Sequence, residues 1–459
     1  MTVWMKHYIE LAASISDPNR QTTPSQTDVT GRLLDGRREQ AFLVGVEGLP
    51  EFGSWPIEAS LEELARLVET AGADVAGQTM LNVRNATAAT LIGKGQLNNV
   101  IQQARAHKAD LLAIDADLHP RQQRNIETAF QGKVLDRTGI ILDIFAARAQ
   151  TVEGRLQVER AQLEYLLPRL SDLWVRFSRQ RGGIGPFRGP GETQIETDRR
   201  LYRDRIAALD KRLEKVRKRR SDRRKRRREA GLLTAAIIGY TNAGKSSLLN
   251  ALSGSRAHIE DKLFATLDPT TRKVSLPGGG TMLATDTVGF IQRLPTRLIQ
   301  AFRATLEEAL TADILIHVVD LSSSNFYQQV DVVEETLGEL GVDRRPVVTA
   351  LNKIDVVPNP DLTDLPNAVA VSAKSGEGIP ALLSRLADIN HNRAVNIEVE
   401  IPYRASGLVA LFHDRGNVQA ESFGPSGTRL HGSIPEVLVS KFDPYRVANK
   451  LSSRRPSTR

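Results

Sequence analysis

The chain has 459 residues, of which 41% are hydrophobic, and it contains no cysteine, which excludes disulfides and thiolate metal sites. Lys and Arg number 62 against 54 Asp and Glu, a net charge of +8 that favours a polyanionic partner: nucleic acid first, an acidic membrane surface second. No apolar run reaches the roughly 18 residues of a membrane span, and the N-terminus lacks the apolar core of a secretory signal. We therefore expect a cytoplasmic protein without a membrane span, with a membrane-associated fraction as the alternative.

Residues 1–37 are rich in Ser, Thr, Gln, Asp and Arg without a sustained period, so we expect a flexible tail. Residues 38–145 alternate between strand-like and helix-like patterns. Ser60 and Gly72 are expected to cap the first helix. The alternation predicts a small α/β domain whose parallel sheet is flanked by helices. Strands are expected near 41–46, 74–83, 111–114 and 133–136, and helices near 60–72, 96–107 and 120–130.

A Gly-Lys-Gly sequence at 93–95 precedes the second helix of this domain. Its glycines would let the backbone approach a phosphate, so Gly93 and Lys94 could form a second anion site. The alternative is a tight turn with an exposed lysine. An isolated Gly-Lys-Gly sequence does not distinguish an anion site from a tight turn.

Residues 146–230 contain two segments of helical period, 146–174 and 194–216, each with a narrow apolar seam. Such helices pair as an antiparallel hairpin, and Pro168 predicts a kink or break in the first. The tip between them, 179–192, combines glycine and proline with several arginines. It suits insertion into RNA, because arginine binds phosphates and stacks on bases. A flexible surface loop is the alternative.

The strongest run of positive charge in the chain covers residues 211–228. A run of one sign carries a cost of self-repulsion and is typical of proteins that bind a polyanion, here rRNA or another RNA. A solvated helix that continues into a linker is one alternative, and a localisation signal is another.

A phosphate-binding loop dominates residues 231–393. An apolar strand ends at Gly239, the pattern G-x-x-x-x-G-K-S fills Gly239–Ser246, and an apolar helical segment follows at 248–252. The backbone N–H groups of such a loop, and the positive end of the helix after it, bind phosphates. Lys245 can reach the β- and γ-phosphates, and the Ser246 hydroxyl can bind Mg²⁺.

Two further segments would complete the phosphate and magnesium site. The strand 281–286 runs into Asp286-Thr-Val-Gly289, so Asp286 can hold Mg²⁺ through water and the Gly289 N–H can sense the γ-phosphate. Thr266, within Phe264-Ala-Thr-Leu-Asp268, is the candidate switch residue whose hydroxyl completes the magnesium shell.

The sequence also predicts selection of guanine. A buried strand, 347–351, runs into Asn352-Lys-Ile-Asp355, and the Asp355 carboxylate can accept two hydrogen bonds from guanine that adenine cannot offer. The Lys353 stem can cover the base, and the segment Ser372–Lys374 can place a backbone N–H on the guanine oxygen. All these motifs follow the carboxyl ends of strands, where α/β sheets bind ligands.

Residues 394–459 alternate between apolar and polar side chains and predict a small β-rich α+β appendage, with strands near 395–401, 407–412 and 418–421. We find no catalytic constellation in it. The last residues, 452–459, are expected to be disordered.

Between about residues 40 and 390 the chain resembles the HflX family of GTPases, within the Obg-HflX superfamily of translation-related P-loop GTPases. The guanine motifs are shared by many GTPases, whereas the sequence of the arm at 188–196 is much more diagnostic. The resemblance rests on Ile92-Gly-Lys-Gly-Gln96, Asp136-Arg-Thr-Gly-Ile-Ile-Leu-Asp143, Arg188-Gly-Pro-Gly-Glu-Thr-Gln-Ile-Glu196 and Phe264-Ala-Thr-Leu-Asp-Pro-Thr-Thr-Arg272.

This resemblance implies an α/β protein with a Ras-like P-loop GTPase domain that hydrolyses GTP to GDP and phosphate. It also implies binding of the large (50S) ribosomal subunit and its rRNA through the N-terminal domain and the arm, and splitting of 70S ribosomes under stress. We expect a monomer. Ser246 and Thr266 would be the magnesium ligands, and Lys245, Thr266 and Gly289 would be catalytic. The nucleotide contacts would be Gly239, Tyr240, Thr241, Asn242, Ala243, Gly244, Lys245, Ser246, Phe264, Ala265, Thr266, Leu267, Asp268, Asp286, Thr287, Val288, Gly289, Asn352, Lys353, Ile354, Asp355, Ser372, Ala373 and Lys374.

Two residues of the loops bear on the rate of hydrolysis. Phe290 stands where Ras-like enzymes place a water-orienting glutamine, and a phenyl ring cannot polarise water. We therefore expect slow intrinsic hydrolysis that the ribosome accelerates. Asn242 matches the asparagine of potassium-stimulated GTPases, so a potassium ion could supply positive charge.

Two other functions stay open from the sequence. One is an RNA-binding scaffold in which the nucleotide is mainly structural, which Phe290 and the density of arginine keep plausible. The other is an NTPase that also uses ATP through the N-terminal domain, for which Gly93 and Lys94 are the only support.

Overall fold

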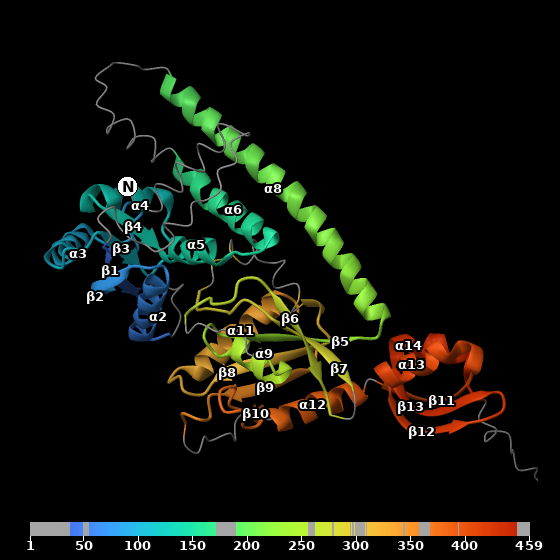
Figure 1. Ribbon diagram of the computed structural model, residues 1–459. Helices are drawn as coiled ribbons and strands as arrows, with labels where there is room; N and C mark the ends of the chain where they lie inside the picture. Colours follow the sequence, from blue (N-terminus) through green and yellow to red (C-terminus); the bar gives the residue numbers. More distant parts are fainter. Residues whose placement is uncertain are drawn as a thin grey trace, which may run out of the picture.

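The computed structural model describes residues 37–48, 55–170, 190–255, 262–277, 280–293, 295, 298, 308, 310–342, 345–357, 368–392 and 394–447. The expected N-terminal tail up to residue 36, the arm tip before residue 190 and the end of the chain after residue 447 lie outside these residues. Figure 1 shows three folded parts, each with its own sheet, and one long helix that runs from the first part to the last.

The N-terminal sheet has the strand order β2-β1-β3-β4, and its pairs are all parallel, as the alternating pattern predicts. Successive residues of β1 point to opposite faces: Ala41 and Leu43 join one core, and Phe42 and Val44 join another. Helices cover both faces, which explains the continuous apolar run of β1. The elements are β1 (Gln40–Glu47), α2 (Ile57–Thr70), β2 (Asp74–Asn82), α3 (Lys94–Ala106), β3 (Leu111–Ile114), α4 (Pro120–Phe130), β4 (Lys133–Asp136) and α5 (Arg137–Arg148).

Two details of this domain differ from the sequence expectation. Helix α2 begins one turn earlier than expected, with Pro56 at the N-cap, so Ser60 is not a cap. The C-cap is Ala71, and Gly72, with a φ of 94°, is the left-handed residue that follows it and ends the helix. Ser60 is fully buried instead. Helix α5 was not expected at all; it follows β4 directly because the Asp136 carboxylate caps it, accepting from Gly139 N at 2.8 Å.

The arm is an antiparallel hairpin of α6 (Val152–Leu166) and α8 (Pro190–Glu229). Glu153 pairs with Arg220, and Arg160 pairs further back along α8 with Asp210, so the two helices run in opposite directions. The expected single helix 146–174 is divided, because α5 ends at Arg148 before α6 begins. The predicted break at Pro168 is confirmed by a 3₁₀ turn, Leu167–Arg169. The buried seam contains Leu156, Leu163, Leu166, Tyr202, Leu209 and Leu213.

The third part of the chain has the strand order β10-β9-β8-β5-β7-β6, with β6 antiparallel at one edge and the other pairs parallel. The carboxyl ends of β5, β7, β8 and β9 therefore meet at one edge of the sheet. The elements are β5 (Leu233–Gly239), α9 (Lys245–Ser253), β6 (Thr270–Ser275), β7 (Thr281–Asp286), β8 (Ile314–Asp320), α11 (Phe326–Glu339), β9 (Val347–Asn352), β10 (Ala368–Ala370) and α12 (Ile379–Asn392).

The C-terminal part is an antiparallel sheet in the order β11-β13-β12, with α13 and α14 packed on it. The strand expected at 407–412 is wrong, because these residues lie in α13. A short continuous apolar run does not distinguish a strand from a buried helix. Phe412 of this helix packs edge-on against Phe442, with ring centroids 5.4 Å apart. The elements are β11 (Ala394–Pro402), α13 (Ser406–Arg415), β12 (Asn417–Phe423), β13 (Gly427–Pro435) and α14 (Glu436–Phe442), with 3₁₀ turns at Tyr403–Ala405 and Asp443–Tyr445.

One apolar core joins three of these parts. It contains residues of α2 and α5, the seam of the arm, and residues that follow β5 and β7 or precede β6, among them Tyr240, Phe264, Leu267, Val288 and Ile291. The N-terminal domain and the arm therefore pack directly on these segments. No helix among the described ranges has the length and apolar character needed to cross a membrane.

Candidate nucleotide-binding site

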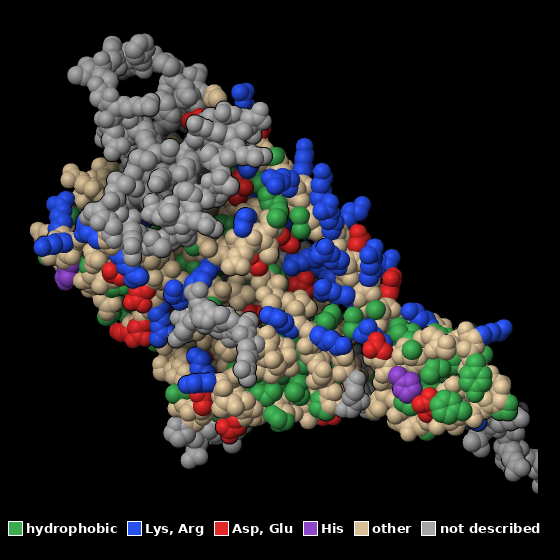
Figure 2. Space-filling view, in the orientation of Figure 1, with side chains coloured by type: hydrophobic (Ala, Val, Ile, Leu, Met, Phe, Trp, Pro, Cys, Tyr) green, Lys and Arg blue, Asp and Glu red, His purple; other side chains and the backbone are tan. Residues whose placement is uncertain are grey.

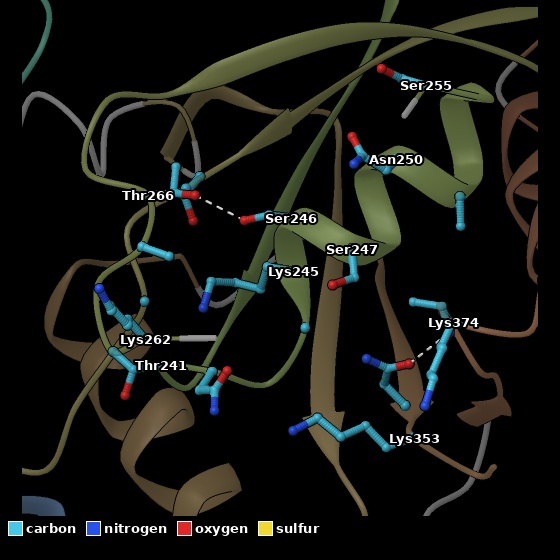
Figure 3. Close-up of a pocket in the computed structure, with 18 of the residues that line it drawn as sticks. Thr241, Lys245, Ser246, Ser247, Asn250, Ser255, Lys262, Thr266, Lys353 and Lys374 are labelled. Carbon is cyan, nitrogen blue, oxygen red and sulfur yellow. Dashed lines mark hydrogen bonds between the residues drawn. The ribbon is translucent and has the colours of Figure 1, made fainter. Parts of the chain in front are cut away.

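A cavity of about 910 Å³ opens at the carboxyl edge of the β5–β9 sheet. Figure 3 shows side chains from the loop after β5, from helix α9 and from the loops after β9 and β10 that face this space. Most of the expected nucleotide contacts line it: Thr241, Asn242, Gly244, Lys245, Ser246, Phe264, Ala265, Thr266, Thr287, Gly289, Asn352, Lys353, Asp355, Ala373 and Lys374.

The remaining expected contacts lie behind this lining rather than in it. Three of them contact lining residues directly: Tyr240 contacts Lys245, Asp286 contacts Ser246, and Ser372 contacts Asp355. The set comprises Gly239, Tyr240, Ala243, Leu267, Asp268, Asp286, Val288, Ile354 and Ser372.

The loop after β5 needs glycine at both ends. Gly239 has a φ of 148° and Gly244 a φ of 93°, both in the region that L side chains rarely adopt. A Cβ at Gly239 would collide with Val318 O of the neighbouring strand, and a Cβ at Gly244 would collide with the Asn352 side chain. This close approach turns the chain so that α9 begins at Lys245 with its N-terminal end at the cavity.

Lys245 is buried, and its ammonium donates to Tyr240 O at 2.6 Å and Gly239 O at 3.2 Å. Burial lowers the pKa of Lys245 to about 8, while the Asp286 carboxylate opposes that shift. A phosphate beside the ammonium would favour its charged form. The arrangement therefore suits a polyphosphate ligand.

Three hard oxygen ligands converge beside Lys245. Ser246 Oγ lies 2.8 Å from Thr266 Oγ1 (Figure 3). It also donates to Asp286 Oδ2 at 2.7 Å. Burial raises the pKa of Asp286, and Lys245 opposes the shift. Hydroxyl and carboxylate oxygens are the ligands that Mg²⁺ prefers when phosphates complete its shell. Within the described ranges there is no cluster of three or more His, Cys, Asp or Glu side chains that could hold a metal ion.

The opposite end of the cavity is built from the guanine motifs. The Asn352 amide donates to Ala243 O at 2.9 Å and accepts from Ala373 N at 3.0 Å, which ties three loops together. Ser372 Oγ donates to Asp355 Oδ1 at 2.7 Å and fixes the carboxylate that would meet the base. Lys353 pairs with Asp320 at 2.6 Å, so its stem is held along the cavity wall.

Phe290 does not face the cavity. Its ring is 1% exposed and packs with Ala236 and Leu315 in the core beneath β5. Its backbone carbonyl accepts from Thr241 N at 2.7 Å. Residue 290 therefore supports the phosphate loop from behind and places no side chain near an attacking water.

Sequence reasoning missed the role of Tyr240. Its ring stacks on Trp55 with centroids 6.3 Å apart, and its hydroxyl contacts the Glu63 carboxylate and accepts from Gln292 N at 2.7 Å. Burial raises the pKa of Tyr240 to about 12. A residue of the phosphate loop is thereby inserted into the N-terminal domain.

A buried charge cluster surrounds that hydroxyl. Arg137 pairs with Glu63 and, at 2.7 Å, with Asp115. Ser60 Oγ donates to Asp115 Oδ2 at 2.5 Å, and Arg293 lies 3.7 Å from the same oxygen. Burial lowers the pKa of Arg137 to about 10 and raises that of Asp115. No local pattern could have indicated this cluster, because its members lie far apart in the sequence.

Comparison with known families agrees with this geometry. Residues 58–146 match the family described as "GTP-binding GTPase N-terminal", residues 148–227 match "GTP-binding GTPase Middle Region", and residues 234–353 match "50S ribosome-binding GTPase". A GTP-binding protein from the archaeon Sulfolobus solfataricus, solved with GDP, is 26% identical and covers 77% of this chain and 99% of its own. Its TM-score of 0.42 is too low to support a conclusion.

Curated relatives match most of the chain. GTPase HflX of Caldanaerobacter subterraneus is 42% identical, covering 86% of this chain and 91% of its own. GTPase HflX of Chlamydia pneumoniae is 41% identical over 94% of both chains. GTPase HflX of Escherichia coli is 39% identical, covering 80% of this chain and 88% of its own. The chain belongs to the HflX family of ribosome-binding GTPases, and its reaction is the hydrolysis of GTP.

Proposed function

We propose that this GTPase binds the large (50S) ribosomal subunit and its rRNA through the N-terminal domain and the arm, and that it dissociates 70S ribosomes under stress. GTP loading would favour binding, and hydrolysis would release the protein. The observation that carries the proposal is the row of cations on helix α8, next to a complete guanine nucleotide site.

The arm separates its apolar and basic faces. Leu209 and Leu213 face α6, whereas the basic side chains between 211 and 226 mostly point outward. Figure 2 shows these Lys and Arg side chains along the outer edge of α8. Such a row of like charge is complementary to a polyanion such as a nucleic acid. The exposed cations are Lys211, Arg212, Lys215, Lys218, Arg219, Arg223, Lys225 and Arg226.

We assign Mg²⁺ to the Ser246 and Thr266 hydroxyls, with Asp286 behind them. The metal would neutralise charge on the transferred phosphate. Phe290 lies in the core, so we expect intrinsic hydrolysis to be slow until a partner supplies the missing groups. Asn242, which lines the cavity, would hold a potassium ion. Equal rates of GTP hydrolysis in potassium and sodium would exclude this potassium site.

The test is GTP hydrolysis with and without purified large ribosomal subunits in potassium buffer. Strong stimulation is expected, and it should weaken with added salt because phosphate contacts release counterions. A Lys218→Glu/Arg219→Glu variant should lose most of the stimulation while its intrinsic rate stays unchanged. The matched control, Arg404→Glu/Lys441→Glu, makes the same change of charge on the C-terminal part. No stimulation of the wild type would contradict the proposal.

A second candidate is an RNA-binding scaffold in which the nucleotide is mainly structural. The buried position of Phe290 favours it, because no side chain from that position can orient water. Lys245→Ala separates the two functions. It should abolish regulated release if the protein is a switch, and leave ribosome binding and release unchanged if the protein is a scaffold.

A further inference from the structure

The carboxylate of Asp268 is bound to the start of the arm rather than to the cavity. Asp268 Oδ2 accepts from the backbone N–H groups of Gln150 and Thr151, each at 2.8 Å. Asp268 Oδ1 accepts from Thr151 Oγ1 at 2.5 Å. Thr151 Oγ1 in turn accepts from Gly154 N at 2.9 Å, as the N-cap of α6. A carboxylate at a helix N-terminus is favoured by both charge and hydrogen bonding.

The other end of the same loop is also fixed by the N-terminal part. Phe264 packs edge-on against Phe145 of α5, with ring centroids 4.7 Å apart. Leu267 is buried in the core that includes Leu156 of α6. Thr266 lies between these two anchors, and its hydroxyl is 2.8 Å from Ser246 Oγ.

From this geometry we infer that Asp268 is a positioning residue: by binding the N-terminus of α6, it holds Thr266 at the magnesium site. The base of the arm is thereby a structural part of the GTPase site. Coupling of this kind is reciprocal, so Mg²⁺·GTP at Thr266 stabilises the contact between Asp268 and α6. The inference goes beyond ribosome binding and does not depend on it.

Gly154 supplies a specific way to break this contact. A Cβ at residue 154 would collide with Asp268 Oδ1, and the Asp268 carboxylate is already held by three hydrogen bonds, one to Oδ1 and two to Oδ2. Alanine is otherwise preferred over glycine within a helix. Gly154→Ala should therefore displace Asp268 while leaving α6 intact, which separates a positioning role from a loss of fold.

The experiment measures single-turnover GTP hydrolysis without ribosomes, together with the affinities for GDP and GTP, in full-length protein. In Gly154→Ala we expect hydrolysis to fall by about ten- to a hundredfold, since small misplacements of catalytic groups have effects of this order. The Mg²⁺ concentration needed for half-maximal rate should rise. GDP affinity should stay within about twofold, because only the triphosphate state needs Thr266. Gly407→Ala, at a helical glycine with open space around it, is the control.

A second pair of variants covers the case in which Gly154→Ala does not fold. Thr151→Val removes the hydroxyl that Asp268 accepts from, and it should reduce hydrolysis in the same GTP-specific way. Thr151→Ser keeps the hydroxyl and should restore the wild-type rate. Wild-type hydrolysis and magnesium dependence in Thr151→Val, or an equal loss of GDP and GTP affinity, would overturn the inference.

Discussion

The two ends of the nucleotide cavity are built in different ways. At the guanine end, Asn352, Asp355 and Ser372 are held by contacts within residues 243–373. At the phosphate end, Tyr240 contacts Glu63, and Asp268 contacts Thr151. The residues expected to recognise the base are thus held within one domain, whereas the loops at the phosphate end contact the N-terminal domain and the arm.

This difference gives the two ends of the cavity different roles in ligand selection and in coupling between domains. A site closed within one domain selects its ligand but transmits little to other domains. A loop that is bonded to a second domain changes that domain whenever the loop moves. We therefore infer that the guanine end selects the base, whereas the phosphate end couples the presence of the γ-phosphate to the arm.

The largest expected effect concerns the guanine end. Asp355→Asn removes the acceptor for two guanine hydrogen bonds, so GTP affinity should fall on the order of 10³-fold or more. Xanthosine triphosphate, which offers an acceptor where guanine has its amine, should bind the variant instead. Titration with both nucleotides measures this. If the guanine end is held only by contacts within its own domain, the thermal stability of the N-terminal domain should not change in this variant. A loss of thermal stability in the N-terminal domain would contradict the difference between the two ends.

Part of the acid sensitivity should come from His317, which is buried near the phosphate end. Burial, with Lys245 adding to it, lowers the pKa of His317 to about 4. The unfolded chain takes up a proton near the ordinary value of about 6.5. The free energy of unfolding should therefore fall as pH drops from about 6.5 to 4, by up to about 3 kcal/mol from this group. Urea titrations across this range should show a flatter pH dependence in His317→Gln; an identical slope would refute the assignment.

Tyr240→Phe tests the contact between the phosphate loop and the N-terminal domain. It leaves the Gln292 N–H and the Glu63 carboxylate short of a buried partner, so we expect a loss of about 2 kcal/mol in unfolding free energy. GTP hydrolysis should change as well, whereas the ratio of GTP to ATP affinity should not. Denaturant titration and nucleotide binding supply the two measurements. Unchanged stability and hydrolysis together would show that the domains are not coupled here.

A smaller effect concerns Lys245, whose pKa of about 8 should rise when phosphate binds. Above about pH 8 the lysine must gain a proton on binding, so GTP affinity should fall by up to about tenfold per pH unit. Calorimetry at pH 9 in buffers of different ionisation enthalpy should show uptake of nearly one proton. Absence of uptake would mean that the lysine is already charged before GTP arrives.

What could be predicted from the sequence follows the same division. The phosphate loop, the guanine motifs and their strands have short local patterns, and the structure places Lys245, Ser246, Asn352 and Asp355 together as expected. The apolar alternation also predicted the parallel N-terminal sheet, and the two apolar seams predicted the hairpin arm.

The parts that were missed depend on distant contacts. Ser60 was expected as a helix cap, but its hydroxyl is buried on Asp115, 55 residues away. No local pattern indicated that the Asp268 carboxylate is bonded to Thr151, 117 residues earlier. The strand expected at 407–412 is a helix because tertiary packing decides the conformation of a short apolar run.

Hydrogen exchange at the start of α6 tests the central claim most directly. Amides of residues 150–155 should be followed in the full-length protein with Mg²⁺ and either GDP or a non-hydrolysable GTP analogue. Coupling through Asp268 predicts slower exchange with the GTP analogue, and loss of that difference in Gly154→Ala. Equal exchange in both nucleotide states, with the nucleotide bound, would contradict the claim that the γ-phosphate end of the site is shared with the arm.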